Sequence, residues 1–116
     1  MTITRLQPGK RMSQAVIHGN VVYLAGQVAT DYAGSIEKQT GEVLDAIDRL
    51  LAEAGTSKHK VLSCQVILNN IADFAAMNTV YDAWIDPANP PARACIEARL
   101  AHLSLKVEII AVAALD

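Results

Sequence analysis

VEIIAVAAL, residues 107–115, decides the fold, because every side chain in it except that of Glu108 is apolar. A strand with one face in water alternates apolar and polar residues, so apolar side chains at odd and even positions predict a strand that is covered on both faces. We expect helices to cover one face and a second subunit to cover the other. The strand is predicted to extend from Lys106 to Ala114.

Two further strands are predicted near the start of the chain. Residues 12–18 (MSQAVIH) and 21–28 (VVYLAGQV) are β-prone runs separated by Gly19-Asn20. Both residues of this pair tolerate positive φ, which is typical of a hairpin turn. The chain is therefore expected to open with an antiparallel pair of strands.

A long amphipathic helix is predicted for residues 36–54, where apolar residues recur at helical spacing. Ser35 is positioned to cap the first turn, although Lys38 stands where a capping box needs an acid. Gly55 follows the last apolar residue, which is typical of a left-handed C-terminal cap.

A strand, a helix and another strand are predicted between this helix and residue 106. Residues 60–69 (KVLSCQVILN) read as a strand. Asp73 is predicted to cap a second helix, from Phe74 to about Ile85. Asp86-Pro87 ends this helix, because the residue before a proline avoids helical backbone angles. The next strand is predicted from Arg93 to Leu100.

The element order β-β-α-β-α-β-β predicts an α+β fold in which two helices pack on one face of a single mixed sheet. One domain spanning residues 1–116 is expected from the length. Apolar residues make up 52% of the chain and charged residues 19%. A small monomer leaves too much surface in water to bury so many apolar residues, so the composition favours a homo-oligomer.

Several partners and compartments are disfavoured by the sequence. A net charge of −2 gives no electrostatic footprint for nucleic acid or an anionic membrane. The first residues are not expected to form a secretory signal, because no apolar segment follows their basic residue. No apolar run approaches the roughly 18 residues of a membrane span. Cys64 and Cys95 lack metal-ligand spacing and are expected to be free thiols, as in a cytoplasmic protein.

No metal site or cofactor is expected. His18, His59 and His102 are scattered without the spacing that builds a metal site. The familiar nucleotide, metalloprotease, redox and serine hydrolase motifs are absent. If the protein is an enzyme, we expect its own side chains to carry the chemistry.

Arg93 is the first candidate for such chemistry. It follows Pro90-Pro91, whose fixed φ angles and missing N–H groups make the entry to the strand rigid. The planar guanidinium suits a carboxylate in bidentate geometry. The alternative is an exposed arginine in an intramolecular ion pair. Taken alone, the position of Arg93 after two prolines favours this alternative.

Glu108 is the second candidate, because an ionised carboxylate inside an apolar strand needs a partner or a catalytic role. If the two closing strands pair through the connection at residues 101–105, Arg93 and Glu108 lie near the same edge of the sheet. A salt bridge between them is then as well supported as catalysis.

Four segments together resemble the reactive-intermediate deaminase family (RidA, also called YjgF): residues 13–28 (SQAVIHGNVVYLAGQV), 73–84 (DFAAMNTVYDAW), 89–100 (NPPARACIEARL) and 106–115 (KVEIIAVAAL). They occur in the family's order over nearly the whole chain. The resemblance implies a chorismate mutase-like fold and a trimer whose sheets form a central barrel with clefts between subunits.

The resemblance implies the hydrolysis of short-lived enamines and imines, such as 2-aminoacrylate and 2-iminopropanoate, to a 2-keto acid and ammonia without a cofactor. Arg93 would bind the substrate carboxylate, and the backbone of Cys95 would contact the imine nitrogen. Gly26 would add a backbone contact, and Glu108 would position the attacking water and carry its proton. Asn78 would line the cleft.

Two residues depart from the family pattern. Met12 stands where the family carries a cleft tyrosine, and Ala25 stands where a serine or threonine is common. Both changes remove a hydrogen-bonding group, and Met12 makes that wall of the cleft apolar. The chain thus resembles a divergent member that keeps the arginine and glutamate, and these departures leave room for a different substrate preference and a low rate on 2-aminoacrylate.

Two alternatives to the deaminase remain open. The first is a non-catalytic trimer that binds a small carboxylate metabolite, which Met12 and Ala25 favour slightly. The second is RNA cleavage, which is attached to some members of the family. The acidic balance and the small number of aromatic residues argue against RNA binding.

Overall fold

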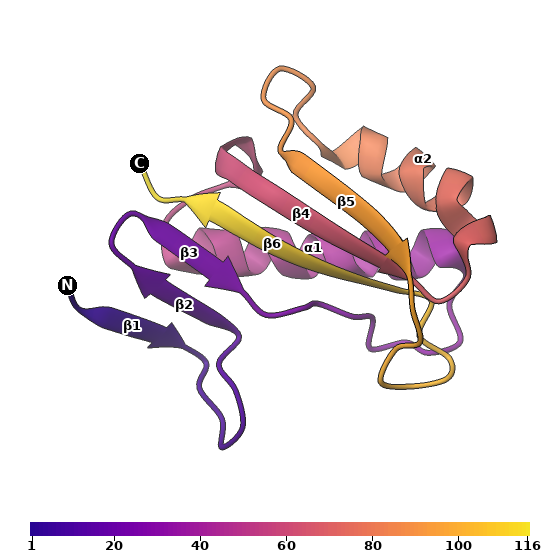
Figure 1. Ribbon diagram of the computed structural model, residues 1–116, viewed down its shortest axis with the longest axis horizontal. Coiled ribbons are helices and arrows are strands. Elements are labelled where there is room, and N and C mark those ends of the chain that lie inside the picture. The colour runs from indigo at the N-terminus through magenta and orange to yellow at the C-terminus, as the bar shows by residue number, and fades with distance from the viewer.

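In the computed structural model, which describes residues 1–116, the last strand of the chain lies in the middle of a six-stranded mixed sheet (Figure 1). This strand, β6 (Val107–Ala114), pairs antiparallel with both of its neighbours, β3 and β4. The sheet order is β1-β2-β3-β6-β4-β5. The other strands are β1 (Ile3–Leu6), β2 (Ala15–His18), β3 (Val21–Leu24), β4 (Val61–Leu68) and β5 (Ala92–Glu97).

Two helices, α1 (Ile36–Ala54) and α2 (Phe74–Trp84), pack on one face of the sheet (Figure 1). Short 3-10 helices, η1 (Lys58–Lys60) and η2 (Ile71–Asp73), precede β4 and α2. The predicted fold, a mixed sheet with two helices on one side, is confirmed.

The two faces of β6 differ in burial. Val107, Ile109, Ala111 and Ala113 are fully buried beneath the helices, whereas the four residues between and after them are only half-buried. The shortest dimension of the molecule is 20 Å, about the thickness of one helix layer on one sheet. The helices therefore cover one face, and the other, called the open face below, has no cover within this chain. Cover by a second subunit stays a prediction.

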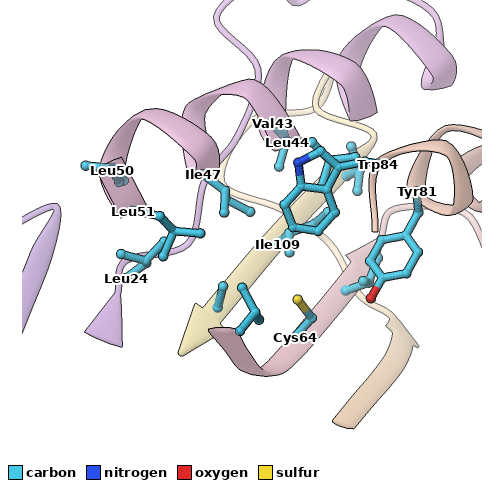
Figure 2. Packing of buried hydrophobic residues seen from close by; sticks show 14 of the residues in the cluster. Leu24, Val43, Leu44, Ile47, Leu50, Leu51, Cys64, Tyr81, Trp84 and Ile109 are labelled. Carbon is cyan, nitrogen blue, oxygen red and sulfur yellow. The ribbon is translucent and has the colours of Figure 1, made fainter. Parts of the chain in front are cut away.

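The core lies between α1 and the middle of the sheet. Figure 2 shows Val43, Leu44 and Ile47 of α1 toward Ile109 of β6, and Leu51 further along the helix beside Leu24; all of these side chains are buried. The 3.6-residue period of the helix brings the four α1 residues onto one stripe. This burial fixes α1 across β6 and orients the strand's odd-numbered side chains away from the open face.

The ends of α1 follow the sequence prediction. The Ser35 hydroxyl accepts a hydrogen bond from the Lys38 N–H at 3.1 Å. Gly55 adopts a φ of +91° and donates its N–H to Ala52. A residue with a Cβ is strained at that angle, so glycine is the residue that ends this helix most readily.

Gly41 offers a test of helix energetics inside α1. A Cβ at this position would meet no atom within 4 Å, and the backbone is helical. Gly41→Ala should raise the free energy of unfolding by about 0.5–1 kcal/mol, because alanine loses less backbone entropy in a helix. Urea denaturation measures this change, and a lower midpoint than that of the wild type would contradict it.

The first strand was not predicted. β1 holds only four residues, and Ile3 is 48% exposed. The strand therefore has no alternation of buried and exposed residues from which to predict it. Pairing with β2 in antiparallel register defines it instead. The predicted strands 12–18 and 21–28 are also too long, since β2 begins at Ala15 and β3 ends at Leu24.

The expectation that the two closing strands pair with each other is wrong. β5 pairs in parallel with β4, and β4 separates it from β6 (Figure 1). The segment from Ala98 to Lys106 is too long for a tight hairpin and crosses the end of β4. Except for Glu108, the side chains of β6 are apolar on both faces. Such a strand is better covered in the middle of the sheet than at an edge.

Asp73 occupies the predicted N-cap position of the second helix, but it does not cap the helix with its side chain. Asn70 instead accepts the Ala72 N–H at 2.9 Å, and the 3-10 turn that it caps continues directly into α2. The helix ends at Trp84, one residue before the predicted end.

Candidate active site

Arg93 lies on β5, the edge strand beside α2 (Figure 1). It is paired in register with Cys64, a core residue, so its side chain emerges on the helix face of the sheet. Nη1 donates a 2.7 Å hydrogen bond to Oδ1 of Asn78. The Cζ atom lies 4.7 Å from the centroid of the Tyr81 ring and 5.8 Å from that of Phe74.

No carboxylate lies within 4.0 Å of the Arg93 guanidinium. The salt bridges of the chain are Lys38–Asp31 and His59–Asp86. The interpretation of Arg93 as half of an intramolecular ion pair is therefore wrong. The exposed guanidinium keeps a full positive charge that an external anion can use.

The main chain of β5 adds hydrogen-bond donors beside Arg93. The Ala98 N–H donates to the Leu68 carbonyl at 2.9 Å. In a parallel pair, every second residue points its N–H group at the same neighbouring strand. Ala98 and the even-numbered residues before it point toward β4, so the N–H groups of Arg93 and Cys95 point to the free edge. The predicted backbone role of Cys95 is compatible with this geometry.

The Cys95 and Cys64 thiols lie on the helix face and are not activated. Burial raises the pKa of the Cys64 thiol to about 11 and also raises the pKa of the Cys95 thiol. Both groups are free cysteines that pack against the core. Neither is a thiolate at neutral pH, so neither is suited to act as a nucleophile.

Glu108 lies on the open face, on the half-buried side of β6, and is paired in register with Ile67. A Cβ built on Gly26 would stand 2.8 Å from the Glu108 Cδ, so the carboxylate lies directly against this glycine. No carboxylate hydrogen bond or ion pair involving Glu108 forms within the chain. The sequence predicts Gly26 and Glu108 as two separate site residues, and the structure places them in contact.

Arg93 and Glu108 do not meet within one chain. Their register partners on β4, Cys64 and Ile67, point to opposite faces of the sheet, and β4 itself lies between them. The expectation of a shared sheet edge is wrong, and so is the interpretation as a salt bridge. The reason is the sheet order, which inserts β4 between the two closing strands.

The open face is hollowed beside β5. A hollow of about 440 Å³ is lined by residues of β4, β5 and β6, with Gln65 and Ile110 paired across its floor. Arg93 is among the lining residues, although its side chain emerges on the helix face of the sheet. The hollow is mostly apolar, which suits the short side chain of a small metabolite better than a second charged group.

Met12 and Ala25 lie near the β2–β3 hairpin, in the half of the sheet away from β5. Met12 is in the connection between β1 and β2 and is 49% exposed. The Ala25 N–H donates to the Gln14 carbonyl at 2.8 Å, which fixes the chain just before Gly26.

Tyr81 and Phe74 were missed as site residues. Together with Asn78 they form a stripe on α2 with spacings of four and three residues, the period of one helix face. The sequence carried this signal, because Asn78 was already a candidate. The stripe could not be linked to Arg93 without the parallel β4–β5 pair that places β5 beside α2.

The structure gives two further facts about the whole chain. No group of three His, Cys, Asp or Glu side chains is placed to hold a metal ion. Neither helix combines the length and the apolar character needed to cross a membrane.

Fold and site together define a small chorismate mutase-like protein with an arginine on its edge strand and a carboxylate on its uncovered sheet face. Residues 2–115 match the family model described as endoribonuclease L-PSP. A RutC family protein from Haemophilus ducreyi is 44% identical over 114 residues, covering 98% of this chain and 97% of that protein. The chain belongs to this RutC/YjgF/L-PSP family, so the resemblance seen in the sequence is confirmed.

Solved structures agree with this assignment. A YjgF family member from Neisseria meningitidis is 40% identical, with a TM-score of 0.97 over 100% of this chain and 97% of that one. A putative endoribonuclease L-PSP from Entamoeba histolytica is 31% identical, with a TM-score of 0.89 over 98% of this chain and 100% of that one. The predicted chorismate mutase-like fold is confirmed by these likenesses.

Proposed function

We propose that the protein hydrolyses reactive enamines and imines of the 2-aminoacrylate and 2-iminopropanoate type to 2-keto acids and ammonia. The observation that carries this proposal is the Arg93 guanidinium, which has no carboxylate partner and lies on a free strand edge beside the Cys95 N–H. A 2-imino acid presents a carboxylate one bond away from its imine carbon. An arginine and a main-chain donor side by side match that pair of groups.

The reaction needs little from the protein, because an imine is already electrophilic. Arg93 binds the carboxylate, and the Cys95 N–H donates to the imine nitrogen. Glu108 takes a proton from the attacking water as the water oxygen bonds to the imine carbon, and the protonated Glu108 gives this proton to the imine nitrogen. Glu108 then takes the hydroxyl proton of the resulting carbinolamine and passes it to the nitrogen as the carbon–nitrogen bond breaks, which releases ammonia and leaves the 2-keto acid. An enamine enters this route after it tautomerises to the imine.

The proposed site requires more than one copy of the chain. Arg93 and Glu108 point to opposite faces of the sheet, so a single chain cannot present both to one small substrate. The open face also exposes large apolar side chains, with Tyr23 at 49% and Ile96 at 44%. We infer a homotrimer in which the β5 edge of one subunit meets the open face of the next, with substrate between them.

A binding module without turnover is the second candidate, favoured by Met12 and Ala25. It would use Arg93 in the same way and report a small carboxylate metabolite to a partner protein. RNA cleavage is named in the family description. A net charge of −2 argues against it.

A coupled assay tests the proposal. An amino-acid oxidase or a threonine dehydratase generates the imine in place, and the release of 2-keto acid is followed with and without the purified protein. We expect faster release with the protein. Release equal to that in buffer would end the deaminase proposal. Tight calorimetric binding of pyruvate without turnover would instead support the binding module, and cleavage of a labelled RNA would support the ribonuclease.

Gly26→Ala should separate activity from stability. The backbone of Gly26 lies outside the left-handed region, so alanine is tolerated there, but its methyl group would collide with the Glu108 carboxylate. The flexible carboxylate should swing away, which lowers kcat about 10- to 100-fold, because a misplaced catalytic group costs about that much. Unfolding free energy should change by no more than about 1 kcal/mol. Gly41→Ala is the control, and equal activity in the two variants would contradict the prediction.

A further inference from the structure

The Arg93 side chain is held by three uncharged residues of one helix. Phe74, Asn78 and Tyr81 lie on the same face of α2, directed at the edge strand β5. Asn78 accepts a hydrogen bond from Nη1, and the two rings flank the guanidinium. The orientation of Arg93 is thus set from α2, behind the strand edge where a ligand would bind.

None of these contacts neutralises the arginine. The Asn78 acceptor is an amide oxygen 2.7 Å from Nη1, which orients the guanidinium without bringing a negative charge. The acid that shares the face of β5 with Arg93 is Glu97, and its carboxylate accepts the Ile71 N–H at 2.8 Å. The guanidinium is therefore positioned while its charge and further N–H groups stay available.

Tyr81 provides a rigid support for the cation. The side chain is 6% exposed, and Figure 2 shows it extending from α2 toward Cys64 in the core cluster. Its ring lies 4.7 Å from Cζ of Arg93, within the range of a cation–π contact. Burial raises the pKa of the phenol to about 12, so the residue stays neutral at physiological pH.

We propose that Asn78 and Tyr81 are positioning residues that orient Arg93 and reserve its charge for the carboxylate of the substrate. The proposal rests on the proposed function only for the identity of that carboxylate. It changes the role of Asn78, which the sequence assigned to the lining of the cleft. Asn78 acts through Arg93 and not through the substrate.

Asn78→Asp is the sharpest variant, because it keeps the shape of the side chain and adds a negative charge at the contact with Nη1. Pyruvate, a stable product analogue, should bind at least about tenfold more weakly, since the guanidinium then has an internal carboxylate partner. Pyruvamide, which lacks the carboxylate, should bind as it does to the wild type. In turnover, KM should rise more than kcat falls.

Thr79→Asp is the matched control. It adds the same charge one residue further along α2, at an exposed position whose hydroxyl bonds to the Ala75 carbonyl and not to Arg93. We expect pyruvate affinity within about twofold of the wild type, since exposed charges at a distance are screened by salt. Tyr81→Phe keeps the ring and should retain affinity, whereas Tyr81→Leu should lose it. Urea denaturation of both Tyr81 variants separates positioning from folding.

A chemical readout tests the positioning without any substrate. Phenylglyoxal modifies arginine, and mass spectrometry measures the rate at Arg93 against Arg5, Arg11, Arg49 and Arg99 in the same chain. Asn78→Asp should slow the modification of Arg93 at least about threefold, because an ion-paired guanidinium reacts less readily, and should leave the other four rates unchanged. An unchanged rate at Arg93 would overturn the positioning proposal whether or not imines are hydrolysed. The proposed function fails separately, if the wild type does not accelerate keto acid release.

Discussion

Arg93→Ala should lower kcat/KM for 2-imino acids by at least about 100-fold. A bidentate pair between arginine and carboxylate contributes about 3 kcal/mol, and each 1.4 kcal/mol is a factor of ten. Arg93 has no partner within the chain that could replace this contact or leave an unpaired charge behind. The loss should therefore appear in substrate binding and turnover, whereas the lost contacts with Asn78 and Tyr81 should lower the free energy of unfolding by only about 1 kcal/mol. The coupled keto acid assay and pyruvate calorimetry measure it.

Arg99→Ala is the matched control for this prediction. Arg99 is an exposed arginine just beyond the end of β5, and it lies outside the proposed site. It should keep at least about half of the wild-type activity, since exposed surface substitutions usually change little. Sedimentation should give the same oligomer for both variants. An Arg93→Ala variant as active as Arg99→Ala would remove the arginine from the mechanism.

Local sequence signals predicted those parts of the fold that carry their own pattern. α1 could be bounded at both ends, because Ser35 and Gly55 each supply a cap and the apolar stripe between them is continuous. The stretch at residues 107–115 predicted a strand with apolar faces, and β6 lies in the middle of the sheet with one face buried beneath the helices. Cover of its open face stays a prediction. β1 escaped prediction because its stability comes from pairing with β2, which leaves no trace in its own four residues.

The two charged candidates of the site could be found from the sequence, but their relation could not. Arg93 and Glu108 each stand out against an apolar or rigid background. Which face each occupies depends on register, since a slip of one residue moves a side chain to the other face. The pairs Arg93–Cys64 and Glu108–Ile67 exist only once β4 lies between the closing strands. That order is set by long-range packing, which no local pattern reports.

Glu108→Gln should lower kcat about 100-fold while pyruvate affinity changes by less than about threefold. General acid–base catalysis typically contributes at least that factor, and a neutral amide keeps the size of the side chain but cannot take a proton. Glu108 has no ion-pair partner in the chain, so its removal leaves no unpaired charge and should not reduce the free energy of unfolding. Single-turnover kinetics and calorimetry separate the two effects. A loss of pyruvate affinity as large as the loss of kcat would show that Glu108 binds substrate and does not move a proton.

Mixed oligomers of Arg93→Ala and Glu108→Gln subunits decide whether the two residues act across an interface. The two variants are unfolded, combined in equal amounts and refolded together. If each site takes Arg93 from one subunit and Glu108 from the next, an interface is intact only when the Glu108→Gln chain supplies the arginine and the Arg93→Ala chain supplies the glutamate. Random assembly of a cyclic oligomer with head-to-tail interfaces gives this arrangement at about one interface in four, so about a quarter of the wild-type activity should return. A site contained within one subunit would always lack one of the two groups, and the mixture would stay inactive. The opposite faces of Arg93 and Glu108 in the single chain lead us to expect the recovery.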